Sequence, residues 1–321
     1  MAAVGIVGAT GLVGRTIAKV LQDRSFPVSS FHPFASGRSR GDTVLFQQRR
    51  HRLEIIRPES IIKGMILFGA TSENIAKKWV NMSRCKGAVV IDNSSAFRMD
   101  PDVLLAVPEV NGGRITGRET LIANPNCSTI QLVVALNPLL ELGEIRWISV
   151  STYQAVSGAG SPALNDLEEQ QKGRSSLPPE ERIHRNIRTS IGLPQDNGYC
   201  REESKLMEET CKIMEQDFPV FASTARVPVV TGHTEAVTVK FDRDVEVEEA
   251  VSLLETAPGV ELSQSGASPV MVEETDTVIV DRIRSHPREK DVLQFWVLAD
   301  NLRKGAALNA VQIAEEYISK K

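Results

Sequence analysis

One cysteine in the stretch LIANPNCSTIQL, residues 121–132, stands where an apolar run gives way to a helical pattern. Cys127 could be a buried apolar residue, half of a disulfide, a metal ligand or a nucleophile. At the start of a helix, unpaired backbone amides and the helix dipole stabilise a thiolate and lower a cysteine pKa from about 8.5. Asn126 precedes the thiol, and Ser128 and Thr129 can donate hydrogen bonds in the first turn. This position is typical of a reactive thiol.

The other cysteines make two of these roles unfavourable. Cys85, Cys200 and Cys211 form no CxxC pair, so we expect no metal site. Four cysteines in 321 residues are too few for a dense disulfide framework, and we expect no secretory leader before them. We therefore expect a reduced, cytoplasmic protein in which the three other thiols are ordinary core or surface residues.

A thiolate nucleophile needs a proton carrier, and the stretch RVPVVTGHTEAV supplies a candidate. His233 follows Gly232 between two strand-like runs, and Arg226 lies seven residues earlier. Alone, such a histidine is more often structural than catalytic; next to a reactive cysteine and a nicotinamide site it becomes the expected acid/base. The remaining histidines stand in polar or arginine-rich contexts: His32, His51, His184 and His286.

The N-terminal stretch GIVGATGLVGRTIAKVL indicates a dinucleotide site. Gly8, Gly11 and Gly14 recur at three-residue spacing between an apolar strand and a helix. Such a turn lets the backbone approach a pyrophosphate, and the helix N-terminus supplies amide donors and a positive dipole. The spacing is a variant of the common fingerprint, and its position between strand and helix favours nucleotide binding over a purely structural turn.

The loop after the second expected strand, ASGRSRG, favours NADP over NAD. Sites that prefer NAD usually present an acidic residue to the ribose there. Here Arg38 is flanked by hydroxyl side chains, and no acidic residue follows before Asp42. A guanidinium group makes charge-assisted hydrogen bonds to phosphate oxygens, so this loop suits a 2′-phosphate.

The elements that must position these residues follow two patterns. In the first third, short apolar runs alternate with helical patterns, which predicts βαβ units and a parallel sheet. From EIRWISVSTYQAVSG onward, longer runs indicate antiparallel strands with an intervening helix, hence a second domain of α+β type. Residues 160–200 are expected to form a polar helical or looped insertion. The final stretch NLRKGAALNAVQIAEEYI predicts an amphipathic helix that returns to the first domain. We assign residues 1–127 plus 301–321 to one domain and 128–300 to the other.

Composition excludes several classes of partner. The net charge is -4 and the hydrophobic fraction is 41%. Nothing in this balance favours nucleic acid or an anionic membrane surface, and we expect the basic cluster QQRRHR, residues 47–52, to be a solvated surface. No segment approaches the roughly 20 apolar residues of a membrane span.

Six stretches, in order, resemble the signatures of aspartate-β-semialdehyde dehydrogenases: GATGLVG, PNCSTIQLVVALNPL, STYQAVSGAG, EESKLMEETCKIM, RVPVVTGHTEAV and DNLRKGAALNAVQIAE. The resemblance implies a Rossmann-type NADP-binding domain completed by the C-terminal helix, a second domain like that of glyceraldehyde-3-phosphate dehydrogenase, and a homodimer. It also implies an activity: NADPH-dependent reduction of L-aspartyl 4-phosphate to L-aspartate 4-semialdehyde and phosphate, through a cysteine acyl-enzyme. The pathway would be biosynthesis of lysine (through diaminopimelate), threonine and methionine.

The resemblance further implies a role for each matching residue. Cys127 would be the nucleophile and His233 the acid/base, with Gln154 orienting the acyl group and Asn126 polarising it. The expected substrate ligands are Arg226 for the α-carboxylate, Glu202 for the amino group, and Arg98 and Lys205 for phosphate. The expected cofactor ligands are Gly8, Thr10, Gly11, Leu12, Val13, Arg38, Ser39, Ser157, Gly158 and Gln312.

One segment departs from the family pattern, because only DNGYCR separates GLPQ from EESK. The ligand of the amino group could therefore be Glu202 or Glu203, and the spacing to Lys205 favours Glu202. Two other functions stay open at this point. N-acetyl-γ-glutamyl-phosphate reductase shares the cysteine and histidine, but the NCSTIQ and QAVSGAG stretches favour the aspartyl enzyme. A non-catalytic nucleotide-binding paralogue would be expected to lose Cys127, His233 or Arg226, and all three are present.

Overall fold

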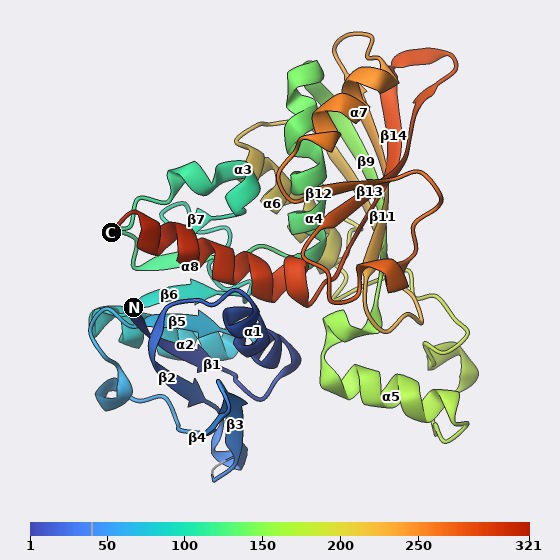
Figure 1. Ribbon diagram of the computed structural model, residues 1–321. Coiled ribbons are helices and arrows are strands. Elements are labelled where there is room, and N and C mark those ends of the chain that lie inside the picture. Colours follow the sequence, from blue (N-terminus) through green and yellow to red (C-terminus); the bar gives the residue numbers. More distant parts are fainter. Residues whose placement is uncertain (40) are drawn as a thin grey trace. The chain divides into compact units, whose positions relative to one another are not determined.

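The chain forms two compact units, residues 1–126 with 306–321 and residues 127–305. A computed structural model describes residues 1–39 and 41–321, without the side chain of Arg38. The expected contact of Arg38 with the cofactor therefore lies outside the described residues. Each unit has its own sheet (Figure 1).

The sheet of the first unit confirms the predicted parallel arrangement. Its strand order is β2-β1-β5-β6-β8-β7, and all its strand pairs are parallel. The strands are β1 (Ala2–Val7), β2 (Val28–Phe34), β5 (Ile66–Gly69), β6 (Val89–Asp92), β7 (Leu104–Leu105) and β8 (Leu121–Ala123). β5, β6 and β8 are buried along their whole length, as expected for parallel strands covered on both faces.

The helices of this unit are α1 (Leu12–Asp23), α2 (Glu73–Cys85), α3 (Pro108–Asn111) and α8 (Asn309–Ser319). The apolar residues of α1 and α8 share one hydrophobic core with the sheet, in which Ile17, Val311 and Tyr317 are buried. α8 contacts α1, α3 and β6, and Figure 1 shows it in red beside β6. The C-terminal helix is therefore an integral part of the first unit.

An antiparallel hairpin, β3 (Thr43–Phe46) and β4 (Arg49–Arg52), was not predicted. Its two-residue turn, Gln47 and Gln48, has positive φ at both positions (47° and 62°). Glycine, asparagine or aspartate usually marks such a turn, so the sequence carried no signal for it. The basic cluster 47–52 lies here, and all its residues except the half-buried His51 are exposed, as expected for a solvated surface.

The second unit holds a mixed sheet with the order β10-β9-β11-β14-β13-β12. Its strands are β9 (Ile145–Gln154), β10 (Val220–Arg226), β11 (His233–Phe241), β12 (Val260–Ser263), β13 (Val278–His286) and β14 (Glu289–Ala299). The central pairs are antiparallel, as the sequence indicated, whereas β9–β10 and β12–β13 are parallel.

The helices of the second unit are α4 (Cys127–Leu136), α5 (Ser161–Gln171), α6 (Arg201–Met214) and α7 (Val247–Glu255). α4 is buried at every position after Cys127 and packs on β11, β13 and β14. The helical pattern continues to Leu142, but only as 3-10 helix from Asn137, because Pro138 lacks the amide that an α-helix needs. In the polar stretch 160–200, α5 is the one α-helix among the described residues.

Shorter helical turns complete the described chain. The 3-10 segments are Gly37–Ser39, Pro58–Ser60, Gly112–Arg114, Asn137–Leu142, Val156–Ala159, Pro179–Glu181 and Pro269–Val272, and a π-helical turn spans Arg303–Leu308.

Candidate active site

Cys127 is the first residue of α4, where the sequence placed it. Its side chain is partly exposed, whereas residues 128–136 are buried and anchor the helix in the core of the second unit. Gly305 packs directly on this cysteine, because a Cβ atom built at Gly305 would lie 2.9 Å from the Cys127 Cβ. The thiol therefore sits at a helix start whose position is fixed on two sides. Gly305 was not singled out from the sequence.

His233 begins β11 and is fully buried. The Ala155 backbone N–H donates to its Nδ1 at 3.0 Å. Since an amide N–H can only donate, Nδ1 is the acceptor, and the neutral ring carries its proton on Nε2. Burial, assisted by the positive charge of Arg226 and opposed by Glu202, lowers the pKa of His233 to about 3. The ring is neutral near pH 7, and its Nε2 has no hydrogen-bond partner among the described residues.

Arg226 ends β10 and lies in the same site. Its Nη1 donates to the Ala155 carbonyl at 2.7 Å, so Ala155 contacts Arg226 and His233 through its two backbone groups. Burial lowers the pKa of Arg226, and the charges of Cys127 and Glu202 oppose that shift. The structure thus brings together the predicted nucleophile, proton carrier and two predicted substrate ligands.

The two glutamates at the start of α6 have different surroundings. Glu203 caps the helix, accepting from the Cys200 amide at 2.8 Å and from the Thr224 amide at 3.0 Å. Glu202 is 8% exposed, and its Oε2 lies 3.0 Å from Lys205 Nζ. Capping occupies Glu203, whereas Glu202 forms an ion pair with Lys205 and is not part of the cap.

The shortened segment before α6 forms a tight turn. The Gln195 amide donates to the Tyr199 carbonyl at 2.9 Å, and the Arg201 amide donates to the Leu193 carbonyl at 3.0 Å. The turn leads directly into α6 at Arg201 and keeps Glu202 in the first helical turn.

Gln154, at the end of β9, is held by two side-chain hydrogen bonds. It is 1% exposed, and its Nε2 donates to Ser128 Oγ at 2.9 Å and to Thr152 Oγ1 at 3.3 Å. Ser128 directly follows Cys127, so this contact ties the predicted acyl-orienting amide to the helix of the nucleophile.

The predicted cofactor residues Ser157 and Gly158 lie in a 3-10 turn after β9. Asn301 holds this turn: its Nδ2 donates to Ser157 Oγ at 2.9 Å, and its Oδ1 accepts from the Gly232 amide at 3.0 Å. A Cβ atom on Gly158 would lie 3.0 Å from Arg226 Nη1 and 3.2 Å from His233 Nε2. Sequence reasoning missed Asn301, whose contacts depend on strands far apart in the chain.

The glycine fingerprint occupies the β1–α1 turn of the first unit. Gly8 has a φ of 94°, and a Cβ there would lie 2.3 Å from the Ala70 carbonyl oxygen. Gly11 is the N-cap of α1, and the predicted ligands Leu12 and Val13 are its first two residues. The chain therefore presents the helix start and close backbone approach that a pyrophosphate requires.

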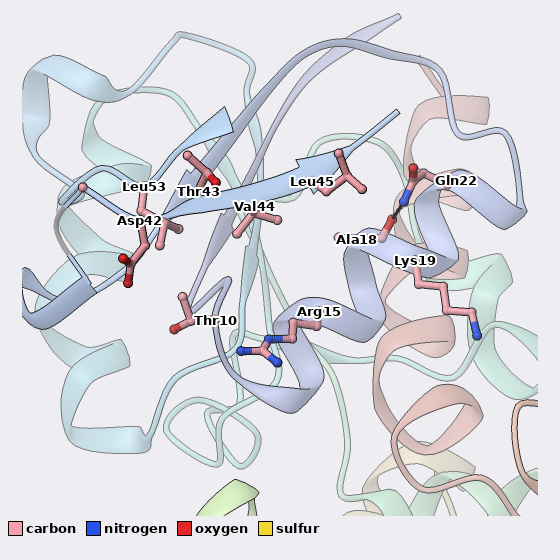
Figure 2. Close-up of a pocket in the computed structure, with 11 residues that line it drawn as sticks. Thr10, Arg15, Ala18, Lys19, Gln22, Asp42, Thr43, Val44, Leu45 and Leu53 are labelled. Carbon is pink, nitrogen blue, oxygen red and sulfur yellow. Dashed lines mark hydrogen bonds between the residues drawn. The ribbon is translucent and has the colours of Figure 1, made fainter. Parts of the chain in front are cut away.

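A cavity of about 770 Å³ opens beside this turn, between α1 and the β3–β4 hairpin. The predicted ligand Thr10 lines it, together with Arg15 and Lys19, which the sequence reading did not select. Figure 2 shows the Arg15 guanidinium group pointing toward Thr10, whereas Lys19 points away. Ser39 lies in the 3-10 turn that follows β2, two residues before Gly41, which also lines the cavity.

Three further predicted residues also belong to the first unit. Arg98 is 7% exposed and donates from Nε to the Asn124 carbonyl at 2.9 Å and from Nη2 to the Asn93 carbonyl at 2.7 Å. Gln312, in α8, donates to Glu109 Oε1 at 2.8 Å. Asn126 is buried and ends the first part of this unit.

Across residues 1–39 and 41–321, no group of three or more His, Cys, Asp or Glu side chains could hold a metal ion. The helices in this part of the chain are too short or too polar to cross a membrane.

Comparison with known proteins agrees with both units. Residues 3–117 match the family described as semialdehyde dehydrogenase, NAD binding domain, and residues 136–304 match semialdehyde dehydrogenase, dimerisation domain. The aspartate-semialdehyde dehydrogenase of Aquifex aeolicus is 43% identical, over 97% of this chain and 96% of that protein. That of Bacillus subtilis is 39% identical, over 97% and 96%. The crystal structure of aspartate semialdehyde dehydrogenase II from Vibrio cholerae, complexed with ASA, has a TM-score of 0.93 and 37% identity, covering 99% of this chain and 98% of that one.

A Rossmann-type nucleotide-binding unit joined to a mixed-sheet unit with a cysteine, histidine and arginine site defines a semialdehyde dehydrogenase, an NAD(P)-dependent oxidoreductase. Within that class, the chain belongs to the aspartate-semialdehyde dehydrogenase family. This confirms the resemblance first drawn from the six sequence stretches.

Proposed function

We propose that this enzyme reduces L-aspartyl 4-phosphate to L-aspartate 4-semialdehyde and phosphate with NADPH, in the biosynthesis of lysine, threonine and methionine. One observation carries the proposal: Cys127, at a helix start, shares a site with Arg226, Glu202 and the neutral His233. Acyl transfer requires a thiol nucleophile and a proton carrier. An aspartyl substrate also requires one group that binds its α-carboxylate and one that binds its ammonium group.

The reaction proceeds through a thioester in this proposal. The Cys127 thiolate attacks the acyl carbon, and the carbon–oxygen bond to phosphate breaks. Bound NADPH would supply a hydride to the thioester carbon, giving the alkoxide form of a thiohemiacetal. The carbon–sulfur bond then breaks, releasing the aldehyde and restoring the thiolate. In this proposal, backbone amides at the start of α4, which begins at Cys127, stabilise the oxyanion that forms at each step.

His233 is the proposed proton carrier. Its Nε2–H is the free end of the ring, because Nδ1 is occupied by the Ala155 amide. The neutral ring can stabilise the developing oxyanion by donating a hydrogen bond from Nε2. Full transfer of that proton would leave an imidazolate, so the described geometry supports hydrogen-bond donation, and proton transfer requires a ring that has first taken up a proton.

The substrate would be held by charge at both ends of its amino acid group. Arg226 can form paired hydrogen bonds to the α-carboxylate, as a planar guanidinium group matches a carboxylate. Glu202 would take the amino group, and its ion pair with Lys205 at 3.0 Å keeps a cation nearby for phosphate. Arg98, held by two backbone carbonyls, is the second proposed phosphate ligand.

We infer that NADP is preferred over NAD. Arg15 adds positive charge beside Thr10 in the cavity, which Asp42 also lines, and the chain following β2 contributes Arg38 and Ser39 before that first acidic residue. A 2′-phosphate suits this environment better than a free ribose hydroxyl group does. The residues of the β1–α1 turn, with Ser157, Gly158 and Gln312, are the other proposed cofactor ligands.

A homodimer is the proposed assembly, with residues 1–127 plus 301–321 binding NADP and 128–300 providing catalysis and dimerisation. The outer face of the second sheet supports it: Phe221 is 53% and Tyr153 37% exposed, next to Trp147 and Trp296. We propose a cytoplasmic location, and no nucleic acid or membrane partner.

The deciding experiment is phosphate-dependent oxidation of L-aspartate 4-semialdehyde, measured with NADP and NAD side by side. We expect NADPH to form only when phosphate is present. We also expect N-acetylglutamate semialdehyde to be a poor substrate. Cys127→Ser should nearly abolish turnover while NADP affinity is retained, and Cys85→Ser, at an exposed thiol, should be fully active. Substantial activity in Cys127→Ser, or a preference for the acetylated substrate, would refute the assignment.

Arg226→Lys tests the carboxylate ligand separately. Loss of the paired hydrogen bonds should raise the KM for the semialdehyde about 10-fold or more, since a charge-assisted bond contributes about 1.5–3 kcal/mol. An unchanged KM would show that Arg226 does not hold the substrate carboxylate.

A further inference from the structure

A carboxyl group with no assigned role lies behind the nucleophile, inside the second unit. Glu235 is fully buried and follows His233 by two residues on β11, so both side chains point to the same face of the sheet. Val237 and Val239 continue that face and are apolar. Glu235 is therefore the one acidic side chain of β11 that enters the core beneath α4.

Glu235 has no countercharge in its surroundings. Within the described chain, neither carboxyl oxygen of Glu235 has an ion-pair partner or a hydrogen-bond partner of good geometry. Burial raises the pKa of Glu235 well above its usual range, and the polar groups of Gln131 and Ser128 offset this only in part. An unpaired carboxylate in such a place would be strongly disfavoured, so the group carries a proton near pH 7.

A neighbouring polar group, the amide of Gln131, can accept a hydrogen bond from the protonated carboxyl group of Glu235. Gln131, one helical turn after Cys127, is fully buried, and its Oε1 also lacks a partner within the described chain. Its Nε2 reaches the carbonyl of Val297, the residue opposite Glu235 on β14, at 3.5 Å. A protonated carboxyl group has one O–H donor, and an amide oxygen accepts it, so Glu235 and Gln131 can satisfy each other.

Ser128 links this pair to the site. It is the second polar neighbour of Glu235, and its Oγ accepts from Gln154 Nε2 at 2.9 Å. Glu235, Ser128 and Gln154 therefore form a continuous buried polar layer below Cys127, all of them 1% exposed or less.

We propose that Glu235 is a positioning residue whose protonated carboxyl group holds Gln131 and Ser128 under the first turns of α4 and thereby fixes the Gln154 amide for acyl transfer. This role rests on the proposed acyl-enzyme chemistry. Glu235 itself does not touch the reacting atoms. Its proton is permanent during turnover, so a neutral group of the same shape should replace it.

Two substitutions at this position separate the proposal from a purely structural role. Glu235→Gln keeps shape and polarity and should retain kcat within about twofold. Glu235→Leu removes the polar contacts and should lower kcat about 10-fold or more, with little change in the KM for the semialdehyde, because misplaced groups cost rate more than binding. Val237→Ala, at the next buried position of the same strand face, is the control: it should lose stability but keep kcat.

A direct measurement of the proton uses the wild type and Glu235→Gln. Because the folded state raises this pKa above 4.5, the folding equilibrium of the wild type should weaken about tenfold per pH unit as pH rises above 4.5, relative to Glu235→Gln. Cys127 and His233, the titratable side chains of α4 and of the buried face of β11, are the same in both proteins. The same holds for the buried Glu202 and Glu209 of α6, the helix packed on α4. An infrared difference spectrum at pH 7 should show a protonated carboxyl carbonyl band that the glutamine variant lacks.

Three results would each count against a positioning role for Glu235. A folded but inactive Glu235→Gln, a fully active Glu235→Leu, or equal pH dependence of folding would overturn the proposal. If Glu235→Leu does not fold, Ser128→Ala takes its place, and unchanged kcat there would likewise overturn it. A wild type without semialdehyde oxidation refutes the proposed function instead, and in that case the infrared band still tests whether Glu235 is protonated.

Discussion

At the scale of single residues, the site depends on one backbone unit and two glycines. The Ala155 amide and carbonyl set the positions of His233 and Arg226, and neither contact depends on the side chain at 155. Gly158 and Gly305 let these residues and Cys127 approach the chain closely. The reactive side chains are therefore placed by main-chain geometry as much as by their own hydrogen bonds.

His233→Asn should remove most turnover and change the acid stability of the protein. Loss of a proton carrier commonly costs about 100-fold or more in kcat. In the wild type the pKa of His233 is about 3 in the folded state, and its ordinary value is 6.5. Between these pH values the histidine binds a proton in the unfolded state but not in the folded state. Stability must fall by about 1.4 kcal/mol per pH unit from this group as pH drops from 6.5 toward 3.

Denaturant unfolding of both proteins across that pH range measures the effect. The variant should lack this contribution, so its stability relative to wild type should improve steadily toward low pH. An identical pH dependence in the two proteins would mean that His233 titrates normally in the folded state.

Alanine at Gly305 or Gly158 should reduce kcat about 10- to 100-fold, because small displacements of reacting groups are costly. The new methyl group would lie 2.9 Å from the Cys127 Cβ in one case and 3.0 Å from Arg226 Nη1 in the other. Gly113→Ala is the matched control, since nothing lies within 4 Å of its added Cβ and its φ is not positive. Steady-state kinetics with all three variants would decide, and normal kcat in both site variants would contradict the packing argument.

At the scale of elements, the β1–α1 turn combines two constraints that can be separated by mutation. A Cβ at Gly14 would lie 2.2 Å from the Gly8 carbonyl oxygen, whereas one at Gly11 would lie 3.4 Å from the same atom. Gly14 is therefore required for packing of the helix on the strand end, and Gly11 only for the approach of a ligand.

Gly14→Ala should destabilise the protein by about 1–3 kcal/mol, as overpacking typically does. Gly11→Ala should change stability by about 0.5 kcal/mol or less. Both should weaken NADP binding, the first by displacing α1 and the second by crowding the pyrophosphate. Thermal unfolding without cofactor and titration with NADP distinguish the two effects. Equal stability losses would show that the glycines share one role.

The sequence predicted those elements whose patterns are local. Alternating apolar runs and helical patterns predicted the parallel sheet of the first unit, and the position of Cys127 before a helical pattern predicted that it begins a helix. The β3–β4 hairpin was missed because its turn uses Gln47 and Gln48. Asn301 and Gly305 could not be found, since their importance comes from contacts with Ser157 and Cys127, which only the tertiary fold brings near.

At the scale of the whole molecule, the two faces of the second sheet differ. Alternate residues of β11 face α4 and are buried, whereas their neighbours on the opposite face are half-exposed. Aromatic residues gather on that opposite face: Trp147 and Phe221 have ring centroids 6.2 Å apart, and Tyr153 and Trp296 5.9 Å apart. Exposed aromatic clusters of this kind mark association surfaces.

Phe221→Asp should therefore convert the proposed homodimer to monomers. If the aromatic face is the subunit contact, a carboxylate at position 221 would have to be buried unpaired, which is strongly unfavourable. Sedimentation equilibrium at several protein concentrations would show a single monomer mass for the variant and a dimer for the wild type. Ile75→Asp, at a side chain of α2 that is 50% exposed, controls for a new surface charge and should remain dimeric. A dimeric Phe221→Asp would place the subunit contact on another surface, because a sheet face that associates through its aromatic residues cannot tolerate this charge.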